Sequence, residues 1–292
     1  HSLSTEERQH ILATVNELRF ANLPPSQIVP ALADEGVYIA SESSFYRVLK
    51  AAKQLAHRGR TKAPVKRTMT THVANAPNQL WSWDITYLPS GVHGLWFYLY
   101  LVMDVYSRKI VAWDIHDTES GEHAAALMTR GYLSENIALN QQPLVLHSDN
   151  GAPMKSATLR ARLEFLGVAA SYSRPRVSND NAYSESLFGT LKYRPDYPAQ
   201  GFVSIEQAQT WVLQFVHWYN ESHYHSGIAY LTPGLRHSSN GDQVLAQRDH
   251  VYAAAKARTP ARWSGTTRRW IAPNEVWLNP ENKNTVTMLD VA

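Results

Sequence analysis

The chain carries the sequence WSWDITYL at residues 81–88, an aromatic and β-branched run that is typical of a sheet strand. Its one charged residue, Asp84, stands in the middle. A carboxylate is costly to bury in a sheet unless it is paired or bound to a metal ion, although a half-exposed strand would let Asp84 face water. The run therefore predicts a strand whose acidic residue needs either a partner or solvent.

Two more strand-like segments follow this run, at residues 96–106 and 109–116, and short turns separate the three. Sequential strands with short turns form an antiparallel meander. Helical and strand-like patterns then alternate over residues 122–133, 144–146, 157–165 and 168–172. A meander followed by such units predicts a mixed sheet covered by helices, an α/β core of the ribonuclease H type.

The residues before this core have helical periodicity. Ser4 and Glu7 have capping-box spacing and predict a helix that ends near Phe20, and Ser26 and Ser41 are candidate caps of two shorter helices. The third helix, near residues 42–54, has the layout of a DNA-reading helix in a helix-turn-helix, with a plain three-helix packing module as the alternative. Its expected DNA contacts are Ser43, Ser44, Arg47 and Lys50.

Basic residues are concentrated in two parts of the chain, although the net charge is only +3. Residues 47–83 hold eight basic residues and no acidic one, and residues 250–274 hold no acidic residue and combine arginines with Trp263 and Trp270. Such segments can meet phosphates and stack on bases, and a solvated surface with a linker is the alternative. The further candidates for DNA contacts are Arg58, Arg60, Arg268 and Arg269.

These patterns divide the chain into four predicted regions. Residues 1–58 form the helix-turn-helix domain, 59–77 a basic linker, 78–235 the α/β core and 236–292 a C-terminal region for DNA binding or assembly, with a small hairpin across 280–282. The 292 residues, 44% of them apolar, suit several domains.

No apolar run of membrane-spanning length and no leader is visible, so we expect a cytoplasmic protein with no membrane partner. The absence of cysteine excludes disulfides and cysteine-containing zinc sites.

Two further acidic residues complete a candidate metal site. Asp149 ends a strand at the edge where α/β sheets tend to place ligands, and Glu185 lies on a helix predicted over residues 181–193. Singly, each has an ordinary explanation, because Asp-Asn-Gly is a common turn and a helical glutamate is usually solvated. Together with Asp84 they can converge, and three carboxylates suit Mg²⁺. Two ions about 3.5–4 Å apart would support in-line displacement at phosphorus.

Five motifs resemble those of a known group. They are WDITYL at 83–88, LVMDVYSRK at 101–109, HSDNG at 147–151, NDNAYSES at 179–186, and HSG at 225–227 with LTP at 231–233. They are similar to the catalytic subunit of transposases of the third bacterial insertion-sequence family, relatives of retroviral integrases. The 35 residues between Asp149 and Glu185 are characteristic of that group.

The resemblance implies that Asp84, Asp149 and Glu185 bind two Mg²⁺ ions, or Mn²⁺ in their place, cleave DNA at insertion-sequence ends and transfer the freed 3′-hydroxyl to a target strand. Lys192 lies seven residues after Glu185, on the same helix face, and matches the family's DNA-contacting basic residue. Asn150 is also expected to contact DNA. The implied partners are insertion-sequence ends and target DNA, with a homo-oligomer on DNA in the bacterial, nucleoid-associated cytoplasm.

Two features depart from the relatives. Retroviral integrases carry a His/Cys zinc module where this chain has its predicted helix-turn-helix, so zinc is not expected. The chain begins with His1 rather than Met, which suggests a trimmed chain or the downstream part of a frameshift fusion, with an upstream reading-frame product as a partner. Two alternatives stay open: a stand-alone nuclease of the same fold, and a non-catalytic helix-turn-helix regulator that tolerates substitution of the carboxylates.

Other conspicuous residues have structural explanations. Asp104 and Arg108 flank a turn between strands and are predicted to form a structural pair. The helical spacing of Trp211, Phe215, Trp218 and Tyr219 favours core packing over base stacking. His217, His223 and His225 are expected to be neutral and hydrogen-bonded rather than metal ligands.

Overall fold

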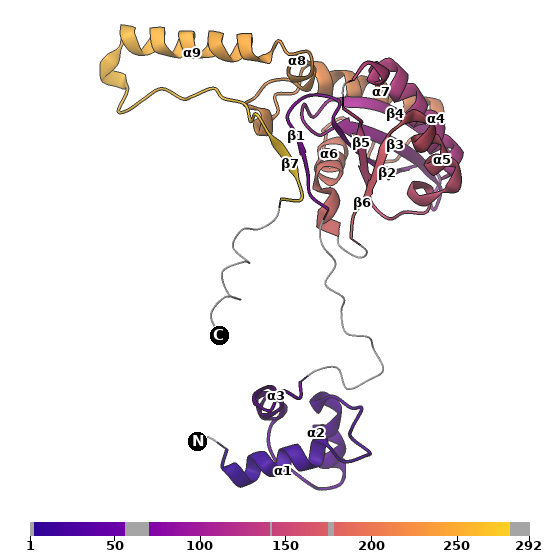
Figure 1. Cartoon of the computed structure of the whole chain (residues 1–292), viewed down its shortest axis with the longest axis vertical. Coiled ribbons are helices and arrows are strands. Elements are labelled where there is room, and N and C mark those ends of the chain that lie inside the picture. Colours follow the sequence, from indigo (N-terminus) through magenta and orange to yellow (C-terminus); the bar gives the residue numbers. More distant parts are fainter. Residues whose placement is uncertain (1–2, 56–69, 141, 175–177, 281–292) are drawn as a thin grey trace. The chain divides into compact units, whose positions relative to one another are not determined.

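The structure of the chain is a computed structural model that describes residues 3–55, 70–140, 142–174 and 178–280 (Figure 1). The chain divides into two compact units, His1–Arg67 and Thr68–Ala292, each with its own apolar core. Across these described ranges, no helix combines the length and the apolar character that crossing a membrane requires.

The first unit consists of three helices, α1 (Thr5–Val15), α2 (Pro25–Asp34) and α3 (Glu42–Ala51). The predicted capping box is present, because the Ser4 hydroxyl accepts from the Glu7 N–H at 3.1 Å and the Glu7 carboxylate accepts from the Ser4 N–H at 2.7 Å. Helix α1 ends at Val15 and not near Phe20, since the following turn carries Phe20 back into the core.

Of the two shorter helices in this unit, one lacks its predicted cap residue and the other lacks its capping hydrogen bond. Helix α2 begins at Pro25 with Pro24 as its N-cap, and no side chain caps it. A proline suits this place because its fixed φ matches the first turn and its missing N–H would have no partner there. Ser41 occupies the predicted N-cap position of α3, but the capping bond is absent, because its hydroxyl makes no hydrogen bond to the helix backbone. Its hydroxyl bonds the Ser44 hydroxyl instead, at 3.1 Å.

The second unit is built on a five-stranded sheet of order β4-β3-β2-β5-β6. Strands β2, β3 and β4 are antiparallel neighbours, and β5 and β6 run parallel to β2. This mixed sheet confirms the prediction of a ribonuclease H-like α/β fold. The strands are β2 (Leu80–Pro89), β3 (Trp96–Asp104), β4 (Ile110–His116), β5 (Val145–Ser148) and β6 (Ala169–Tyr172).

Helices cover both faces of this sheet (Figure 1). Trp81 and Trp83 of β2 pack with α4 and α5, whereas Leu88 of β2 packs with α6 and α7. Because side chains alternate across a strand, Ser82 and Asp84 belong to the face that α6 and α7 cover. These helices are α4 (Gly121–Ser134), α5 (Ala157–Leu166), α6 (Ala182–Lys192) and α7 (Ile205–Glu221).

A second, two-stranded sheet pairs β1 (His72–Ala74) with β7 (Val276–Leu278) in antiparallel register. This pairing corrects the prediction that residues 70–77 belong to a linker, since β1 finds its partner some two hundred residues away and no local pattern announces it. The predicted hairpin across residues 280–282 stays a prediction, and the strand expected as its first arm, β7, pairs with β1. The second arm of that hairpin lies outside the described residues.

The C-terminal region contains a long helix that we did not predict, α9 (Gly241–Arg258), which follows the short α8 (Pro233–His237). Only Gly241 and Leu245 of α9 are buried, so an apolar stripe is nearly absent and periodicity could not reveal the helix. The 3₁₀ helices of the described chain are η1 (Ile137–Leu139), η2 (Pro153–Lys155), η3 (Ser178–Asn181), η4 (Ser226–Ile228) and η5 (Pro260–Arg262).

Candidate active site

Asp84 and Asp149 reach the same edge of the sheet through the register of two neighbouring strands. The parallel pairing of β2 with β5 ends with Ser82 opposite His147. Two residues further along each strand direction stand Asp84 and Asp149. A step of two residues along a strand returns a side chain to the same face of the sheet. Asp84 and Asp149 therefore lie side by side at this edge.

Glu185 comes to this edge through helix α6, which is hydrogen-bonded to β2. The buried Ser82 hydroxyl donates to Asn181 Oδ1 at 2.6 Å and lies 2.7 Å from the Ser184 hydroxyl. A hydroxyl has one proton, so Ser184 is the donor in the second bond. The Asn181 amide in turn donates to the Trp83 carbonyl at 3.3 Å. These contacts hold the first turn of α6, which includes Glu185, against the strand that carries Asp84.

The segment before α6 is fixed by an ion pair. The Arg174 guanidinium donates to both oxygens of Asp180, at 3.0 and 2.9 Å, and the Arg174 N–H donates to the same carboxylate at 2.8 Å. Arg174 holds the pKa of Asp180 below its ordinary value. The carbonyl of Asp180 lies 3.0 Å from Nε2 of the buried His147, so β5 and the start of α6 are joined. Burial lowers the pKa of His147 to about 4, which keeps it neutral.

The site carries an excess of negative charge. Burial and the charges of Asp149 and Glu185 together raise the pKa of Asp84 to about 7, against the opposing hydrogen bond from the Ile85 N–H. A smaller contribution comes from Glu119. Within the described parts of the chain, no lysine or arginine forms an ion pair with Asp84, Asp149 or Glu185. Such a cluster favours either a shared proton or a bound cation.

The donor chemistry fits a divalent cation. Asp84 Oδ1 accepts from the Ile85 N–H and Asp149 Oδ1 from the Gly151 N–H, both at 2.8 Å. The second oxygen of each carboxylate makes no hydrogen bond to a described residue. Hard ions such as Mg²⁺ take such oxygens as ligands. No cluster of three or more His, Asp or Glu side chains, in the chain as far as it is described, is already spaced around a common metal position.

The two DNA contacts predicted near this site, Lys192 and Asn150, differ in the exposure and the hydrogen bonding of their side chains. Lys192 ends α6, is exposed, and has its pKa lowered by partial desolvation. Asn150 is half-buried, and its amide donates to the Ser173 carbonyl at 2.6 Å. That bond joins the ends of β5 and β6, which is a structural task that we did not expect for Asn150.

In the first unit, Ser43, Arg47 and Lys50 are exposed on α3. Ser44 is only 8% exposed, and its hydroxyl is bonded to Ser41 and accepts from the Arg47 guanidinium at 3.0 Å. This is a structural role and not the DNA-facing position that we expected for Ser44. Arg58 and Arg60 lie outside the described residues. In the second unit Arg268 and Arg269 are exposed, and Arg268 stacks on Trp270 and Tyr230.

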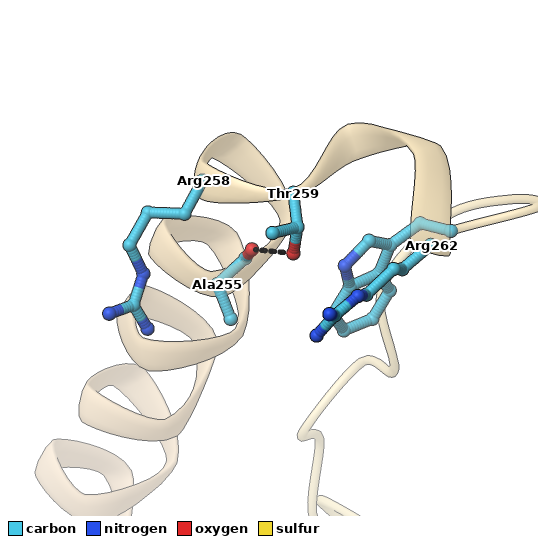
Figure 2. Close-up of a pocket in the computed structure, with 5 residues that line it drawn as sticks. Ala255, Arg258, Thr259 and Arg262 are labelled. Carbon is cyan, nitrogen blue, oxygen red and sulfur yellow. Dashed lines mark hydrogen bonds between the residues drawn. The ribbon is translucent and has the colours of Figure 1, made fainter.

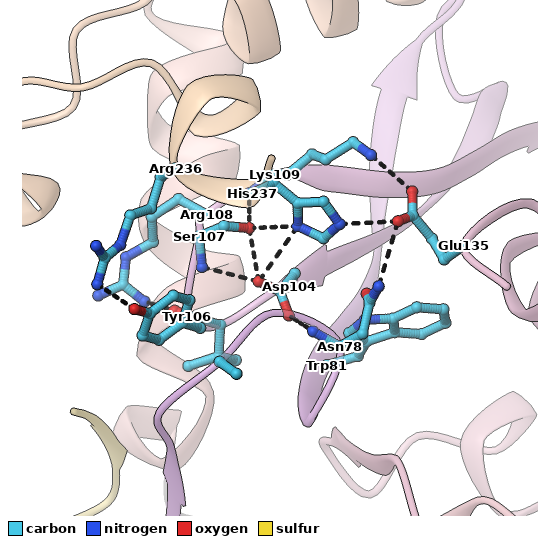
Figure 3. Close-up of polar contacts among 12 residues, drawn as sticks. Asn78, Trp81, Asp104, Tyr106, Ser107, Arg108, Lys109, Glu135, Arg236 and His237 are labelled. Carbon is cyan, nitrogen blue, oxygen red and sulfur yellow. Dashed lines mark hydrogen bonds and ion pairs between the residues drawn. The ribbon is translucent and has the colours of Figure 1, made fainter. Parts of the chain in front are cut away.

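Asp104 and Arg108 are joined through their backbones, because the Arg108 N–H donates to the Asp104 carbonyl at 2.8 Å, but their side chains form no ion pair with each other. The fully buried Asp104 carboxylate accepts from the Ser107 N–H at 2.8 Å, the Ser107 hydroxyl at 2.6 Å and the Asn78 N–H at 2.8 Å, and it lies 3.7 Å from His237 Nδ1 (Figure 3). The Arg108 guanidinium donates instead to the Val105 carbonyl.

Of the other structural expectations, the one for the aromatic residues of α7 agrees with the packing, and the one for the histidines is borne out for His225. Trp211, Phe215, Trp218 and Tyr219 pack in the core between α7 and the sheet, as their spacing predicted. His225 is held by the Gly227 N–H at 3.1 Å, and burial lowers its pKa to about 4. His223 stacks on Tyr219, and His217 is exposed.

Sequence reasoning missed the residues that position the carboxylates. Ser82, Asn181 and Ser184 are buried polar residues whose bonds hold α6 on β2. One signal was available for Ser82, since it shares a strand face with Asp84 at a spacing of two. For Asn181 and Ser184 no such signal exists, because a polar residue in the first turn of a helix is usually solvated.

The mixed sheet with an acidic edge defines a ribonuclease H-like protein of the integrase type. Two family models, both described as integrase core domain, match residues 74–178 and 166–233. The chain is 33% identical to the transposase for insertion sequence element IS904 of Lactococcus lactis over 161 residues, 55% of this chain and 61% of that protein. It is 29% identical to transposase InsF for insertion sequence IS3A of Escherichia coli over 161 residues, 55% of this chain and 54% of that one.

The chain thus covers less than two thirds of the length of either relative. Over residues 74–233 the chain belongs to the integrase core family. A solved structure of the simian T-cell lymphotropic virus intasome in complex with PP2A regulatory subunit B56 gamma contains a chain of 16% identity, with a TM-score of 0.47 over 73% of this chain and 74% of that one. The HTLV-2 integrase catalytic core domain in complex with magnesium has the same identity and a TM-score of 0.38, over 56% of this chain and 97% of that one.

Proposed function

We propose that this chain is a DNA transposase that cleaves a phosphodiester at the ends of an insertion sequence and joins the freed 3′-hydroxyl to another strand. The observation that carries the proposal is the acidic edge, where the β2–β5 register and the Ser82 contacts to α6 bring Asp84, Asp149 and Glu185 toward one another. Membership of the integrase core family supports the same reaction class.

Asp84, Asp149 and Glu185 would hold the divalent cation, Mg²⁺ or Mn²⁺, with two ions shared among their oxygens. The raised pKa of Asp84 supports this assignment, because a cation relieves the repulsion that a shared proton otherwise relieves. Bound divalent ions would activate the attacking hydroxyl and stabilise the leaving oxygen at phosphorus. The protein's part is to hold the carboxylates in place and to orient the DNA.

The DNA would be held by several parts of the chain. The three helices of the first unit, with Ser43, Arg47 and Lys50 exposed on α3, would act as a helix-turn-helix on the insertion-sequence end. Lys192 on α6 would contact the strand next to the cleavage point, and the C-terminal region, with Arg268 and Arg269, would bind DNA or support assembly. A homo-oligomer on DNA would allow two ends to be joined at one target, and an upstream reading-frame product is a further proposed partner.

The regions 1–58, 59–77, 78–235 and 236–292 remain our proposal for how these tasks are divided, with β1 now assigned to the fold of the core rather than to the linker. The proposed place of action is the bacterial cytoplasm, at the nucleoid.

The test is to incubate the full chain with Mg²⁺ and labelled duplexes taken from the DNA on either side of its gene, and to size the products. Nicked and joined products are expected from the wild type, and neither from Asp149→Asn or Glu185→Gln. Glu164→Gln, at an exposed glutamate of α5, is the matched control and should keep full activity. Cleavage retained by Asp149→Asn contradicts the proposal. Equal cutting of unrelated DNA without joined products would instead identify a stand-alone nuclease.

A further inference from the structure

A pocket at the end of α9 lies outside the acidic edge and is lined by Ala255, Arg258, Thr259, Arg262 and Trp263 (Figure 2). We call it the α9 pocket. Its volume of about 550 Å³ falls within the range of small-molecule sites, roughly 300–1,000 Å³. The pocket is open to solvent, so a chain that continues on either side of a bound group can pass through it.

The two arginines of the α9 pocket have no partner. Among the described residues, neither the Arg258 nor the Arg262 guanidinium forms an ion pair or donates a side-chain hydrogen bond. Some other arginines of this unit are engaged, since Arg174 holds Asp180 and Arg248 donates to the Ala229 and Tyr230 carbonyls, whereas Arg160 and Arg269 are exposed like Arg258 and Arg262. No acidic residue stands between residues 250 and 274 to neutralise the pocket.

The pocket walls are held by hydrogen bonds that do not use the arginines. The Thr259 hydroxyl donates to the Ala255 carbonyl at 3.3 Å (Figure 2). The chain then reverses through η5, where Pro260 fixes the first position and the Arg262 N–H donates to the Thr259 carbonyl at 3.1 Å. The Lys256 ammonium group on α9 donates a hydrogen bond to the Gly265 carbonyl at 2.7 Å, which holds Gly265 close to the helix. The pocket is therefore preformed, which lowers the cost of ordering it on binding.

An ordinary explanation covers only one of the arginines. Arg258 lies in the last turn of α9, where the helix dipole favours a cation without any ligand. Arg262 lies beyond the end of α9, in η5, and has no such stabilisation. Both guanidinium groups line one pocket that has no acidic lining residue, and such a surface suits an anionic ligand.

Trp263 adds an aromatic wall to the charged pocket. Its ring is half-buried and is held by Tyr252 at 6.3 Å between ring centroids, with an interplanar angle of 67°. By contrast, Trp270 is already occupied by the guanidinium groups of Arg248 and Arg268, at 4.9 and 4.3 Å. An indole beside two unpaired guanidinium groups matches a phosphate joined to a planar base.

We propose that the α9 pocket binds one unpaired nucleotide of DNA, with its phosphate between Arg258 and Arg262 and its base on Trp263. This inference rests on the proposed function, in which DNA is the substrate. An unpaired nucleotide is required because bases within a duplex are already stacked on both faces. An enzyme that breaks one strand creates such nucleotides, because the new end frays.

The test measures binding of fluorescent oligonucleotides to the full chain by anisotropy, in EDTA so that no cleavage occurs. The probes are a single strand of about 20 thymidines and a blunt duplex of the same length. Trp263→Ala should weaken single-strand binding roughly tenfold and leave duplex binding nearly unchanged, and Trp263→Phe should restore most of the loss. Arg262→Ala should weaken single-strand binding and reduce the slope of log affinity against log salt by about 0.7.

Arg160→Ala removes an exposed arginine of α5 and is the matched charge control, with little change expected. None of the substituted residues belongs to an apolar core cluster, and unchanged melting curves would verify that the variants fold. The pocket proposal is overturned if Trp263→Ala binds the single strand like the wild type, or if it weakens both probes equally, which would indicate contact with a duplex backbone. A wild type that binds neither probe would overturn the proposed function itself.

Discussion

The Ser82 hydroxyl lies 2.7 Å from the Ser184 hydroxyl, and this buried contact joins the strand that carries Asp84 to the helix that carries Glu185. The two serines are 102 residues apart in the sequence. Each is within two residues of a candidate metal ligand. The distance between the Asp84 and Glu185 carboxylates therefore depends on a hydrogen bond between two neutral side chains.

Ser82→Ala should destabilise the fold and impair catalysis more than its stability loss explains. The substitution leaves Asn181 Oδ1 and the Ser184 hydroxyl buried without their partner, which costs about 1–3 kcal/mol. Urea unfolding measures the free energy of unfolding, and the nicking rate is measured well below the transition. Ser186→Ala, at an exposed serine of the same helix, should change neither quantity. A Ser82→Ala variant with wild-type stability and activity would show that α6 is held in another way.

Asp84→Asn should stabilise the metal-free protein at high pH while abolishing activity. The folded state raises the pKa of Asp84 to about 7 from an ordinary value of 3.8, chiefly by burial. The folded state then binds more protons than the unfolded state between these values, so wild-type stability falls as pH rises from about 4 to about 7. Asparagine cannot ionise, and the variant should gain roughly 1–3 kcal/mol over the wild type at pH 8.

Thermal melts in EDTA at pH 5 and pH 8 give the comparison. The advantage of Asp84→Asn should be present at pH 8 and small or absent at pH 5, and adding Mg²⁺ should stabilise the wild type but not the variant. Asp117→Asn, at an exposed aspartate, is the control and should show no such dependence on pH. A variant that is less stable than the wild type at both pH values would mean that Asp84 is not under electrostatic strain.

His237→Ala should destabilise the second unit by about 2–3 kcal/mol at pH 6, because it unpairs buried carboxylates. His237 Nε2 lies 2.8 Å from Glu135 Oε2, and its Nδ1 lies 2.9 Å from the Ser107 hydroxyl (Figure 3). Glu135 keeps its 2.7 Å ion pair with Lys109, which limits the loss. Urea unfolding is the measurement, and His217→Ala, at an exposed histidine of α7, should have little effect.

The effect of His237 should depend on pH. Burial lowers the pKa of His237, but the hydrogen bonds to Asp104 and Glu135 raise it above the ordinary value of 6.5 overall. This stabilisation is complete below pH 6.5 and is lost as pH rises through the raised pKa, so the gap between wild type and variant should shrink at pH 9. The pKa of Glu135 is lowered to about 2 despite its burial, so its contribution is lost only in strong acid. A gap that widens with pH would contradict this account.

Val276→Asp should destabilise the second unit by about 2–4 kcal/mol, whereas the same substitution at its neighbour Trp277 should have a small effect. Val276 is 5% exposed and packs with Ala74 and Val105, and Trp277 is 46% exposed on the opposite face of β7. The Tyr183 hydroxyl donates to the Trp277 carbonyl at 2.8 Å, so loss of β7 should also loosen α6 and lower the nicking rate. Equal effects of the two substitutions would show that the β1–β7 sheet does not form.

Much of the core could be predicted because its elements have strong local patterns. The strand near Asp84 and the two after it are rich in aromatic and β-branched residues, and both α4 and α5 were found within two residues of their ends. The β1–β7 sheet could not be predicted, since each strand has three residues and gains its stability only from the other. Helix α9 was missed because its exposed surface has no apolar period.

The sequence by itself determined the strands and helices of the α/β core, the family that it resembles and the three carboxylates that are candidate metal ligands, because periodicity and short motifs are local properties of a chain. Only the tertiary structure decided which polar residues hold those carboxylates, that Ser44 is buried, that the Asp104 carboxylate is tied to His237 rather than to the Arg108 side chain, and that Arg258 and Arg262 line one pocket. The physical reason is that a buried polar group must find a hydrogen-bond partner in space, and the chain brings that partner from a distant segment that no local pattern can identify.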